Sequence, residues 1–289
     1  MTTGMTGPFQ LPDLSPEPQV MRAGDLAYGR GRVLLLVVAH ADDPAIFAGG
    51  VLALFVQAGW QVHALRVTDD RWDSVGLPEA QTIALNAAEF RAAAGVLGLA
   101  GAHDLGWQTD VLGDASRVAL RERIIHAIRR LKPYALMGFD PDAMFYEDNL
   151  DHKVLAEAVD EAFWTAMFDK HHPEHFAEGL APHGTVERWY FGRTIAAVTH
   201  VFDTETVIDA QMRAVGCHAT PIANMARQYA LQAQTAGRPP AETARALADP
   251  AAALCARLRA AAEAKGAPFG CRAAEYLRLH RTRFADEAH

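Results

Sequence analysis

Short apolar runs alternate along the chain with longer stretches in which apolar residues recur at helical spacing. We interpret three of these runs as strands, at residues 33–38, 61–68 and 134–139, and the first of them is fully apolar and half β-branched. The stretches with helical character cover residues 49–58, 79–97, 120–131 and 151–168. Strands that alternate with helices predict an open, mostly parallel sheet with helices on both faces, which places the chain in the α/β class.

The alternation of strands and helices is not seen in the first twenty residues or after residue 168. Residues 1–20 contain four prolines and predict an extended or disordered tail. Residues 169–185 are polar and predict a surface loop, and residues 186–202 return to strand character. The part from about 204 to 289 is mostly alanine-rich helix. We therefore expect one domain over residues 21–289, which ends in a helical C-terminal extension.

Composition and charge narrow the functional classes. The 289 residues include 27 Lys and Arg against 35 Asp and Glu, a net charge of −8 without a basic block, which argues against nucleic acid as a partner. No apolar stretch reaches the roughly eighteen residues of a membrane span, and the first residues lack the basic and apolar segments of a signal peptide. Three cysteines without a C-x-x-C pair predict neither a disulfide framework nor a thiolate metal site. We expect a cytoplasmic protein that acts on a small molecule, and the sequence leaves homo-oligomerisation open.

An imidazole and two carboxylates follow the first strand directly, in the segment Ala39-His40-Ala41-Asp42-Asp43-Pro44. In open α/β sheets, ligands bind beyond the carboxyl ends of the strands. His40 and Asp43 are close enough in sequence to bind one cation, whereas Asp42 is displaced and can address a metal-bound water. This donor set suits Zn²⁺, whose catalytic sites combine three protein ligands with one open position, and it leaves other divalent metals open. Helix capping by Asp42 or Asp43 is the alternative, but capping leaves His40 unexplained.

The third ligand is expected from residues 148–152, Asp-Asn-Leu-Asp-His, which follow the third predicted strand and open a long helix. Asn149 and His152 are three residues apart, so the first helical turn places both on one face. His152 alone would be an ordinary first-turn histidine. Beside Asn149 and Asp151, near a strand end, it is the better candidate for a ligand.

Taken together, these segments resemble the LmbE-like, PIG-L family of metal-dependent N-deacetylases. The family begins with A-H-P-D-D-E, continues through a Gly-Gly pair and a helix, and ends its second strand with T-D-G. The corresponding positions here read AHADDP, Gly49-Gly50 and TDD, and the family motif H-x-D-H is matched by residues 149–152, NLDH. Weaker similarity at 86–98, 105–107, 215–220 and 274–277 extends the resemblance over about residues 31–280.

The resemblance implies a Rossmann-like, mostly parallel sheet sandwiched by helices. It makes His40, Asp43 and His152 the ligands of Zn²⁺, Asp42 the general base, and Asp151 a support for the second motif. The reaction that it implies is hydrolysis of an N-acetyl or related amide, often on a glucosamine-type sugar. The expected partner is therefore a small, polar N-acyl substrate.

One departure from the family pattern bears on the mechanism. Asn149 stands where the family has the histidine that is thought to stabilise the oxyanion and to protonate the leaving amine. An asparagine can donate a hydrogen bond but cannot deliver a proton at neutral pH, so acid catalysis would fall to Asp42 or to the substrate. Two further interpretations stay open: an amidase of an amino-acid or natural-product conjugate, and a ligand-binding member of the family with weakened catalysis. A second departure is Asn86, where the family often has arginine.

Three residues are weaker candidates for contact with the substrate. Arg71 and Trp72 lie just past the second strand, where Trp72 could provide a stacking face for a sugar. Asp110 follows residues 105–107, near the position of a family aspartate that contacts substrate. Exposed loop positions are the alternative interpretation for Arg71 and Trp72.

For three other features a structural role is the favoured interpretation. Gly49-Gly50 lacks the G-x-G-x-x-G frame of a dinucleotide site, so close helix–sheet packing is favoured. Residues 171–175, HHPEH, lie in a polar loop, and a solvated loop is favoured over a second metal site. For His218, core packing or support of the ligands is favoured over ligation.

Overall fold

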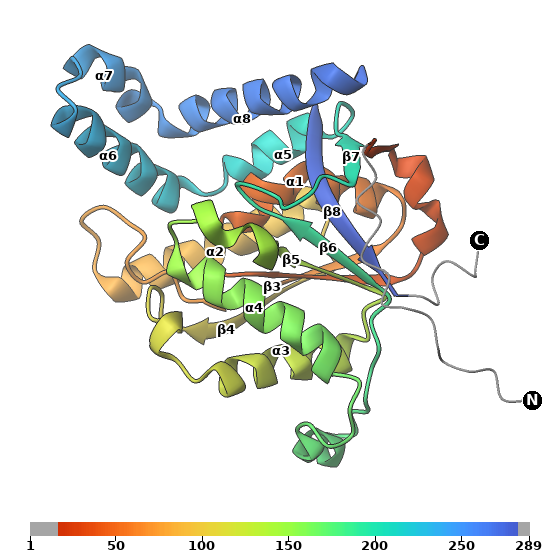
Figure 1. The fold of residues 1–289 in the computed structure, drawn as a ribbon. Helices are drawn as coiled ribbons and strands as arrows, with labels where there is room; N and C mark the ends of the chain where they lie inside the picture. Colours follow the sequence, from red (N-terminus) through yellow and green to blue (C-terminus); the bar gives the residue numbers. More distant parts are fainter. Residues whose placement is uncertain (1–16, 283–289) are drawn as a thin grey trace, which may run out of the picture.

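The computed structural model describes residues 17–282, and an eight-stranded sheet runs through its centre (Figure 1). In chain order the strands are β1 (Gln19–Met21), β2 (Val33–Val38), β3 (Gln61–Thr68), β4 (Gly101–Trp107), β5 (Ala135–Phe139), β6 (Glu187–Phe191), β7 (His200–Asp203) and β8 (Ala274–Arg281). Across the sheet they lie in the order β1-β7-β8-β6-β5-β2-β3-β4. Every neighbouring pair is parallel except the two that β8 makes with β6 and β7. The predicted mostly parallel sheet is therefore confirmed.

Helices connect most of these strands. The α-helices of the described residues are α1 (Asp43–Gln57), α2 (Glu79–Leu97), α3 (Arg117–Leu131), α4 (Leu150–Thr165), α5 (Ile208–Val215), α6 (Ala219–Thr235), α7 (Pro240–Ala248) and α8 (Pro250–Gly266). Short 3₁₀ helices are η1 (Ala23–Gly29), η2 (Leu112–Asp114), η3 (Pro141–Tyr146), η4 (Pro173–Glu178) and η5 (Ala267–Phe269). Helix α2 has its predicted bounds, whereas α1 begins before the predicted residue 49, because Pro44 is compatible with the first turn of a helix. No helix in this part of the chain combines the length and apolar character that crossing a membrane requires.

Strand β2 is buried on both faces, as its unbroken apolar sequence predicts. Leu34 and Leu36 belong to one core cluster with side chains of α1 and α2, and Leu35 and Val37 belong to a second cluster with side chains of α3 and α4. Burial of each large apolar side chain contributes about 1.5–3 kcal/mol. The helices therefore form two layers, with α1, α2 and α5 on one face of the sheet and α3 and α4 on the other (Figure 1).

The C-terminal part is helical over residues 208–266, as expected, but the chain then returns to the sheet as β8. The expected helical extension did not include this strand. The sequence of β8 does not look like a buried strand, because it includes the charged residues Glu275 and Arg278. Both of these side chains are nevertheless buried. Arg278 Nε donates to Asp140 Oδ2 at 3.0 Å, and Glu275 Oε1 accepts from Gln211 Nε2 at 2.6 Å. Buried charges need such partners, and the partners cannot be seen in a local sequence pattern.

The N-terminal tail expected over residues 1–20 is too long by at least two residues. Strand β1 begins at Gln19, whose backbone N–H donates to the oxygen of Thr199 at 2.9 Å, and it pairs in parallel with β7. The unpaired backbone groups of an edge strand provide this partner for an extended segment. The tail before residue 17 lies outside the described residues.

Residues 169–185 are organised around a buried arginine, so the prediction of a solvated loop is wrong for part of them. Arg129 donates hydrogen bonds to four backbone oxygens between residues 166 and 172, at 2.8–3.3 Å. His175 is buried in η4, and its Nε2 lies 2.7 Å from Glu122 Oε1. Within the described residues, no group of three metal-ligating side chains occurs here. The hydrogen bonds of Arg129 and His175 therefore stabilise the fold of this segment.

Gly49 and Gly50 allow α1 to pack closely, as predicted: Gly49 faces α5, and Gly50 faces the sheet, at Glu275 of β8 and at Thr204, which follows β7. A Cβ atom on Gly49 would lie 2.7 Å from Cγ of Gln211, which is on α5. A Cβ atom on Gly50 would lie 2.7 Å from Cγ2 of Thr204. Neither position accepts a side chain without movement of its neighbour.

His200→Gln is expected to make the free energy of unfolding less dependent on pH. Burial, and to a smaller extent Arg281, lowers the pKa of His200 from 6.5 to about 4. Between these pH values the unfolded chain binds a proton that the folded chain does not bind. The fold therefore loses roughly 1–3 kcal/mol as the pH falls from 6.5 to 4. Urea unfolding at pH 7.5 and pH 5 measures this loss, and an equal loss in the variant would contradict the assignment.

Candidate active site

The two segments with candidate ligands meet at one edge of the sheet. Strands β2 and β5 are neighbours, and β3 and β4 follow on one side of them while β6 lies on the other. Open α/β sheets bind ligands at such a point, where the strand order reverses. Strand β2 leads into the loop with His40 and Asp42, and β5 leads through η3 to Asn149 and His152.

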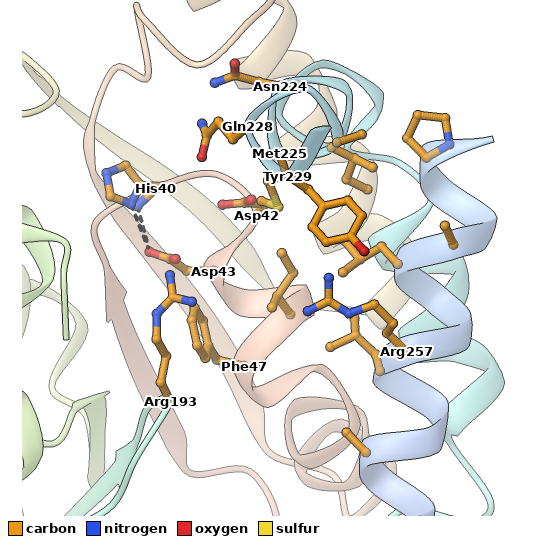
Figure 2. Close-up of a pocket in the computed structure, with 18 of the residues that line it drawn as sticks. His40, Asp42, Asp43, Phe47, Arg193, Asn224, Met225, Gln228, Tyr229 and Arg257 are labelled. Carbon is orange, nitrogen blue, oxygen red and sulfur yellow. Dashed lines mark hydrogen bonds and ion pairs between the residues drawn. The ribbon is translucent and has the colours of Figure 1, made fainter. Parts of the chain in front are cut away.

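Three side chains from these segments converge on one point. His40 Nδ1 lies 3.1 Å from His152 Nε2 and 3.6 Å from Asp43 Oδ2. Asp43 Oδ1 lies 3.3 Å from His152 Nε2, and Figure 2 shows Asp43 directed at His40. All three side chains are buried, and their ligand atoms fall within 4.8 Å of one another. Two imidazole nitrogens and one carboxylate oxygen form a donor set that suits a catalytic zinc ion.

A carboxylate lies behind each imidazole, next to the ring nitrogen that does not face this point. Asp151 Oδ2 is 3.5 Å from His40 Nε2, and Glu147 Oε2 is 3.3 Å from His152 Nδ1. Such partners keep the proton on the outer nitrogen and leave the inner lone pair for a metal. The residues present therefore fit a divalent cation. Sequence reasoning missed Glu147, although its place in the same loop, five residues before His152, is a usable signal.

The cluster favours protons on the imidazoles and a negative charge on Asp43. Burial opposes a charge on His40 and His152, but Asp43 and the carboxylates behind the rings raise the pKa of both above the usual range. Burial likewise opposes a charge on Asp43, but the two imidazoles lower its pKa. Because metal ligands must be deprotonated, a cation that binds here displaces protons.

Asp42 lies beside these residues with a free carboxylate. It is the N-cap residue of α1, but its side chain makes no capping hydrogen bond, so the capping interpretation is wrong for Asp42. Asp43 accepts a hydrogen bond from the backbone N–H of His40 at 2.8 Å, which closes the loop. Asp42 lines the cavity of the site, and burial, together with the charges of Asp43 and Asp73, raises its pKa. A carboxylate in this environment is suited to accept a proton.

Asn149 caps α4 with its carbonyl oxygen and leaves its amide nitrogen for the cavity. Its Oδ1 accepts a hydrogen bond from the backbone N–H of Asp151 at 2.9 Å, which sets the orientation of the amide group. The residue lines the cavity, and Nδ2 makes no hydrogen bond to the described residues. Asn149 therefore offers an N–H donor, as its residue type predicts.

Asp151 ties a second loop to the site. It is fully buried, and its two oxygens accept hydrogen bonds from the backbone N–H groups of Asp110 at 2.7 Å and Leu112 at 3.2 Å. Asp110 has a left-handed backbone conformation at this point, with φ of 62°. It lines the cavity, where the sequence analysis expected a contact with substrate.

Trp72 lines the cavity, and Arg71 does not. The Trp72 side chain is 45% exposed, and its Nε1 donates to Glu79 Oε1 at 3.1 Å. The Arg71 guanidinium turns to Asp69, at 2.6 Å, and to Glu79, at 3.7 Å. The structure thus directs Arg71 to its own loop and away from the expected contact with substrate.

Asp70 braces the loop after β2, and the sequence analysis did not single it out. It stands at the glycine position of T-D-G, with a left-handed φ of 54°. Its Oδ2 accepts hydrogen bonds from the backbone N–H of Ala41 and from Arg66, both at 2.9 Å. Burial raises the pKa of Asp70 to about 6, against the opposing charges of His40 and Arg66. Asn86, which replaces the family arginine, donates to the backbone oxygen of Asp70 at 3.2 Å and helps to hold this turn.

The site opens into a cavity of about 1330 Å³ that reaches from His40 to the C-terminal helices. Its lining includes, as Figure 2 shows, Arg193 after β6, Asn224, Gln228 and Tyr229 of α6, and Arg257 of α8. Sequence reasoning missed these residues, because an alanine-rich helix carries no motif that identifies the face toward a site. Only the packing of α6 against α2, and of α8 against α5 and β8, reveals it.

His218 is not one of the converging donors, and it has the environment of a neutral core histidine. It is fully buried, and its two ring nitrogens have no hydrogen-bond partner among the described residues. Burial lowers its pKa to about 4. It is not part of the group that could hold a metal ion.

Comparisons with known proteins connect this site to a family. Residues 35–163 match the family model described as PIG-L: GlcNAc-PI de-N-acetylase, and they include both loops of the site. The 1D-myo-inositol 2-acetamido-2-deoxy-α-D-glucopyranoside deacetylase of Rhodococcus jostii (strain RHA1) is 27% identical over 255 residues, which cover 69% of this chain and 86% of the relative. The protein of the same name from Rhodococcus erythropolis is 28% identical over 241 residues, with 65% and 81% covered.

Solved structures of similar fold include two with different reactions. The N,N′-diacetylchitobiose deacetylase from Pyrococcus horikoshii has a TM-score of 0.69 and 18% identity, and the match covers 89% of this chain and 88% of that one. The 4-carboxy-2-hydroxymuconate hydratase from Pseudomonas putida KT2440 has a TM-score of 0.63 and 18% identity, with 87% and 97% covered. These likenesses show the fold, which is a scaffold for more than one chemistry. The family model and the sequence relatives go further, because they show that the chain is similar to the PIG-L, or LmbE-like, family over the part that contains both loops of the site.

Proposed function

We propose that the chain is a zinc-dependent amidohydrolase that removes an N-acetyl group from a sugar-like small molecule. The observation that carries this proposal is the convergence of His40, Asp43 and His152, with the free carboxylate of Asp42 beside them in one cavity. The relatives from Rhodococcus are named as deacetylases of an acetamido sugar joined to inositol, which supports an acetamido sugar as the substrate class.

The roles follow from the positions of the side chains. His40, Asp43 and His152 would hold the ion, which when bound polarises the amide carbonyl and lowers the pKa of a water molecule. Asp42 takes the proton of this water as the water oxygen adds to the carbonyl carbon. Asn149 donates its Nδ2–H to the oxyanion that develops on the carbonyl oxygen.

The proton on Asp42 then passes to the leaving nitrogen as the C–N bond breaks, so that the products are acetate and a free amine. Asn149 has no proton to give at neutral pH. Asp42 is the better carrier, because burial and the charges of Asp43 and Asp73 raise its pKa and stabilise its protonated form. One carboxylate thus acts first as the base and then as the acid.

The cavity wall offers groups for a polar ring. The exposed face of Trp72 can stack on a sugar, and Asp110 and Gln228 can accept or donate hydrogen bonds to its hydroxyls. These contacts would leave the acetamido group to face Asp42.

Amine release by the purified, zinc-loaded protein tests the proposal. The substrates are the acetamido sugar joined to inositol, N,N′-diacetylchitobiose, and an N-acetylated amino acid as the arm for the alternative substrate class. Elemental analysis of the same sample is expected to give about one zinc per chain. A protein that holds zinc and releases amine from no compound would overturn the proposal and favour a ligand-binding role.

Asn149→Ala is expected to lower kcat by about 10²-fold, the scale for the loss of one oxyanion donor. The kcat of the wild type is expected to rise with pH to a plateau, without a descending limb near neutrality, because no imidazole at this position loses a proton. Asn149→His introduces such an imidazole and is expected to add a descending limb. The measurement is kcat against pH for the three proteins.

A second substitution separates donation from helix capping. Asn149→Asp keeps an oxygen for the N-cap of α4 but removes the N–H donor, and it is expected to be at least as slow as Asn149→Ala. If Asn149→Asp is as fast as the wild type, the capping oxygen alone explains the effect. If Asn149→Ala is as fast, the residue has no catalytic role.

A further inference from the structure

Two histidines lie side by side near the amino ends of β3 and β4, away from the active site. His63 is on β3, and His103 is on β4, the strand at one edge of the sheet. The candidate ligands follow the carboxyl end of β2, which runs parallel to β3. We name His63 and His103 the histidine pair. None of the roles described above involves these two side chains.

The register of β3 and β4 brings the histidine pair together. His63 is paired with Gly101, and His103 follows Gly101 by two residues on the same strand. Residues that are two apart in a strand point to the same face of the sheet, so both rings lie on one face. Leu65 shows that this is the face covered by α3 and α4, because it belongs to their core cluster. Both histidines are half-buried, so water can reach their rings.

The two rings have the spacing of ligands that share a metal ion. His63 Nδ1 lies 3.1 Å from His103 Nε2. In the active site the same two kinds of nitrogen have the same separation, since His40 Nδ1 lies 3.1 Å from His152 Nε2. Two nitrogens that each bind one ion at about 2.0–2.1 Å, with about 100° between the bonds, are also about 3.1 Å apart.

Gly101 leaves a position open in front of both nitrogens. A Cβ atom on this residue would lie 2.5 Å from His63 Nδ1 and 2.8 Å from His103 Nε2, and these two nitrogens would be its nearest neighbours. A hydrogen bond between the rings requires no such space, whereas an ion must approach both lone pairs at one point. The histidine pair therefore faces a common position that any other residue than glycine would fill.

The surroundings favour neutral imidazoles and offer no carboxylate. Burial, together with Arg130, lowers the pKa of both histidines, so each ring keeps a lone pair for a metal at pH 7. Asp104, the next residue after His103, already accepts hydrogen bonds from two arginines, at 2.7 and 3.0 Å. Among the described residues, no third metal-ligating side chain joins the pair. Water would complete the coordination, and Ca²⁺ and Mg²⁺, which require oxygen ligands from the protein, do not fit.

We propose that the histidine pair is a second metal site, separate from the reaction centre, and that it binds Cu²⁺ through two imidazole nitrogens. Imidazole suits Cu²⁺, Ni²⁺ and Zn²⁺, and a given nitrogen site binds Cu²⁺ most tightly of the three. With two protein ligands and the positive charge of Arg130 nearby, the pair holds zinc weakly. Dialysis would therefore still leave about one zinc per chain, at the active site. The inference does not depend on deacetylation.

Copper titration of the zinc-loaded protein tests the proposal. One equivalent of Cu²⁺ is expected to bind without release of zinc, and its electron paramagnetic resonance spectrum is expected to show nitrogen ligands. His63→Gln and His103→Gln each remove a ligand and should lower the copper affinity, measured against a competing chelator, by at least about ten-fold. His171→Gln is the control, because His171 is a half-buried histidine in another segment, and it is expected to bind copper as the wild type does. Copper that binds only as zinc leaves, or with unchanged affinity in either ligand variant, would overturn the proposal.

Two further variants keep both histidines and test the open position and the local charge. Gly101→Ala places a Cβ atom between the nitrogens, so the rings must move apart, and a loss of at least about ten-fold in copper affinity is expected. Arg130→Gln removes a repelling charge and is expected to raise the affinity by a few-fold. The kcat of the zinc-loaded variants is expected to stay unchanged, because these residues do not line the cavity. Wild-type copper affinity in Gly101→Ala would show that the nitrogens do not face this position, and the proposal would be wrong.

Discussion

Asp42→Asn is expected to lower kcat by roughly 10²–10⁴-fold and to leave the zinc content unchanged, the scale for the loss of a general base. The substitution keeps the volume of the side chain and removes its proton acceptor. It should disturb little else, because the carboxylate makes no capping hydrogen bond and is not one of the three converging donors. Steady-state kinetics on an acetamido sugar, together with elemental analysis, measures both quantities.

Asp73→Asn is the matched control for this prediction. Asp73 is also a carboxylate in the cavity wall, and the new amide oxygen can still accept the hydrogen bond from Asn224. We expect a change of a few-fold at most, because the charge of Asp73 acts on the reaction only by raising the pKa of Asp42. Equal losses in the two variants, or no loss in Asp42→Asn, would mean that another group activates the water.

His152→Ala is expected to weaken zinc binding by more than about 100-fold and to abolish turnover. The variant loses one of the three donors that face a common point. Loss of a hydrogen-bond partner outside the ligands already costs about 10–100-fold in metal affinity, so the loss of a ligand should cost more. Titration with zinc against a competing chelator measures the affinity of the purified protein.

Two further variants turn this result into a graded series. Glu147→Gln keeps the ligand but removes the carboxylate behind it, and it is expected to lose about 10–100-fold in zinc affinity. Asp42→Ala is expected to bind zinc as the wild type does. A His152→Ala protein that holds one zinc per chain as tightly as the wild type would exclude this site.

The sequence was most informative where chemistry depends on local spacing. His40 and Asp43 are three residues apart, and the hydrogen bond from the backbone N–H of His40 to Asp43 Oδ2 closes the turn before α1 locally. The same holds for the position of His152 in the first turn of α4. The strand pattern was equally direct for β2, because a strand buried on both faces must be apolar throughout.

Features that depend on distant partners could not be predicted in this way. The polar strand β8 is stable in the sheet because Arg278 meets Asp140, which precedes it by more than a hundred residues. In the sequence, Asp70 cannot be distinguished from other turn residues. Its role is visible only in the structure, where Oδ2 accepts hydrogen bonds from Arg66 and from the backbone N–H of Ala41. The cavity likewise reaches beyond the two loops of the site only because α6 and α8 contribute to its lining.

The position of β8 has a consequence for the synthesis of the protein. This strand fills the gap between β6 and β7, and β1 is joined to the sheet only through β7. A ribosome makes β6 and β7 about seventy to ninety residues before it makes β8, and translation proceeds at roughly 5–20 residues per second. For several seconds, therefore, a nascent chain carries two strands with unpaired backbone N–H and C=O groups at their edges. Such edges can pair with other chains and lead to aggregation. The same late strand brings Glu275 into the cavity wall, so the sheet and the site are completed in a single step.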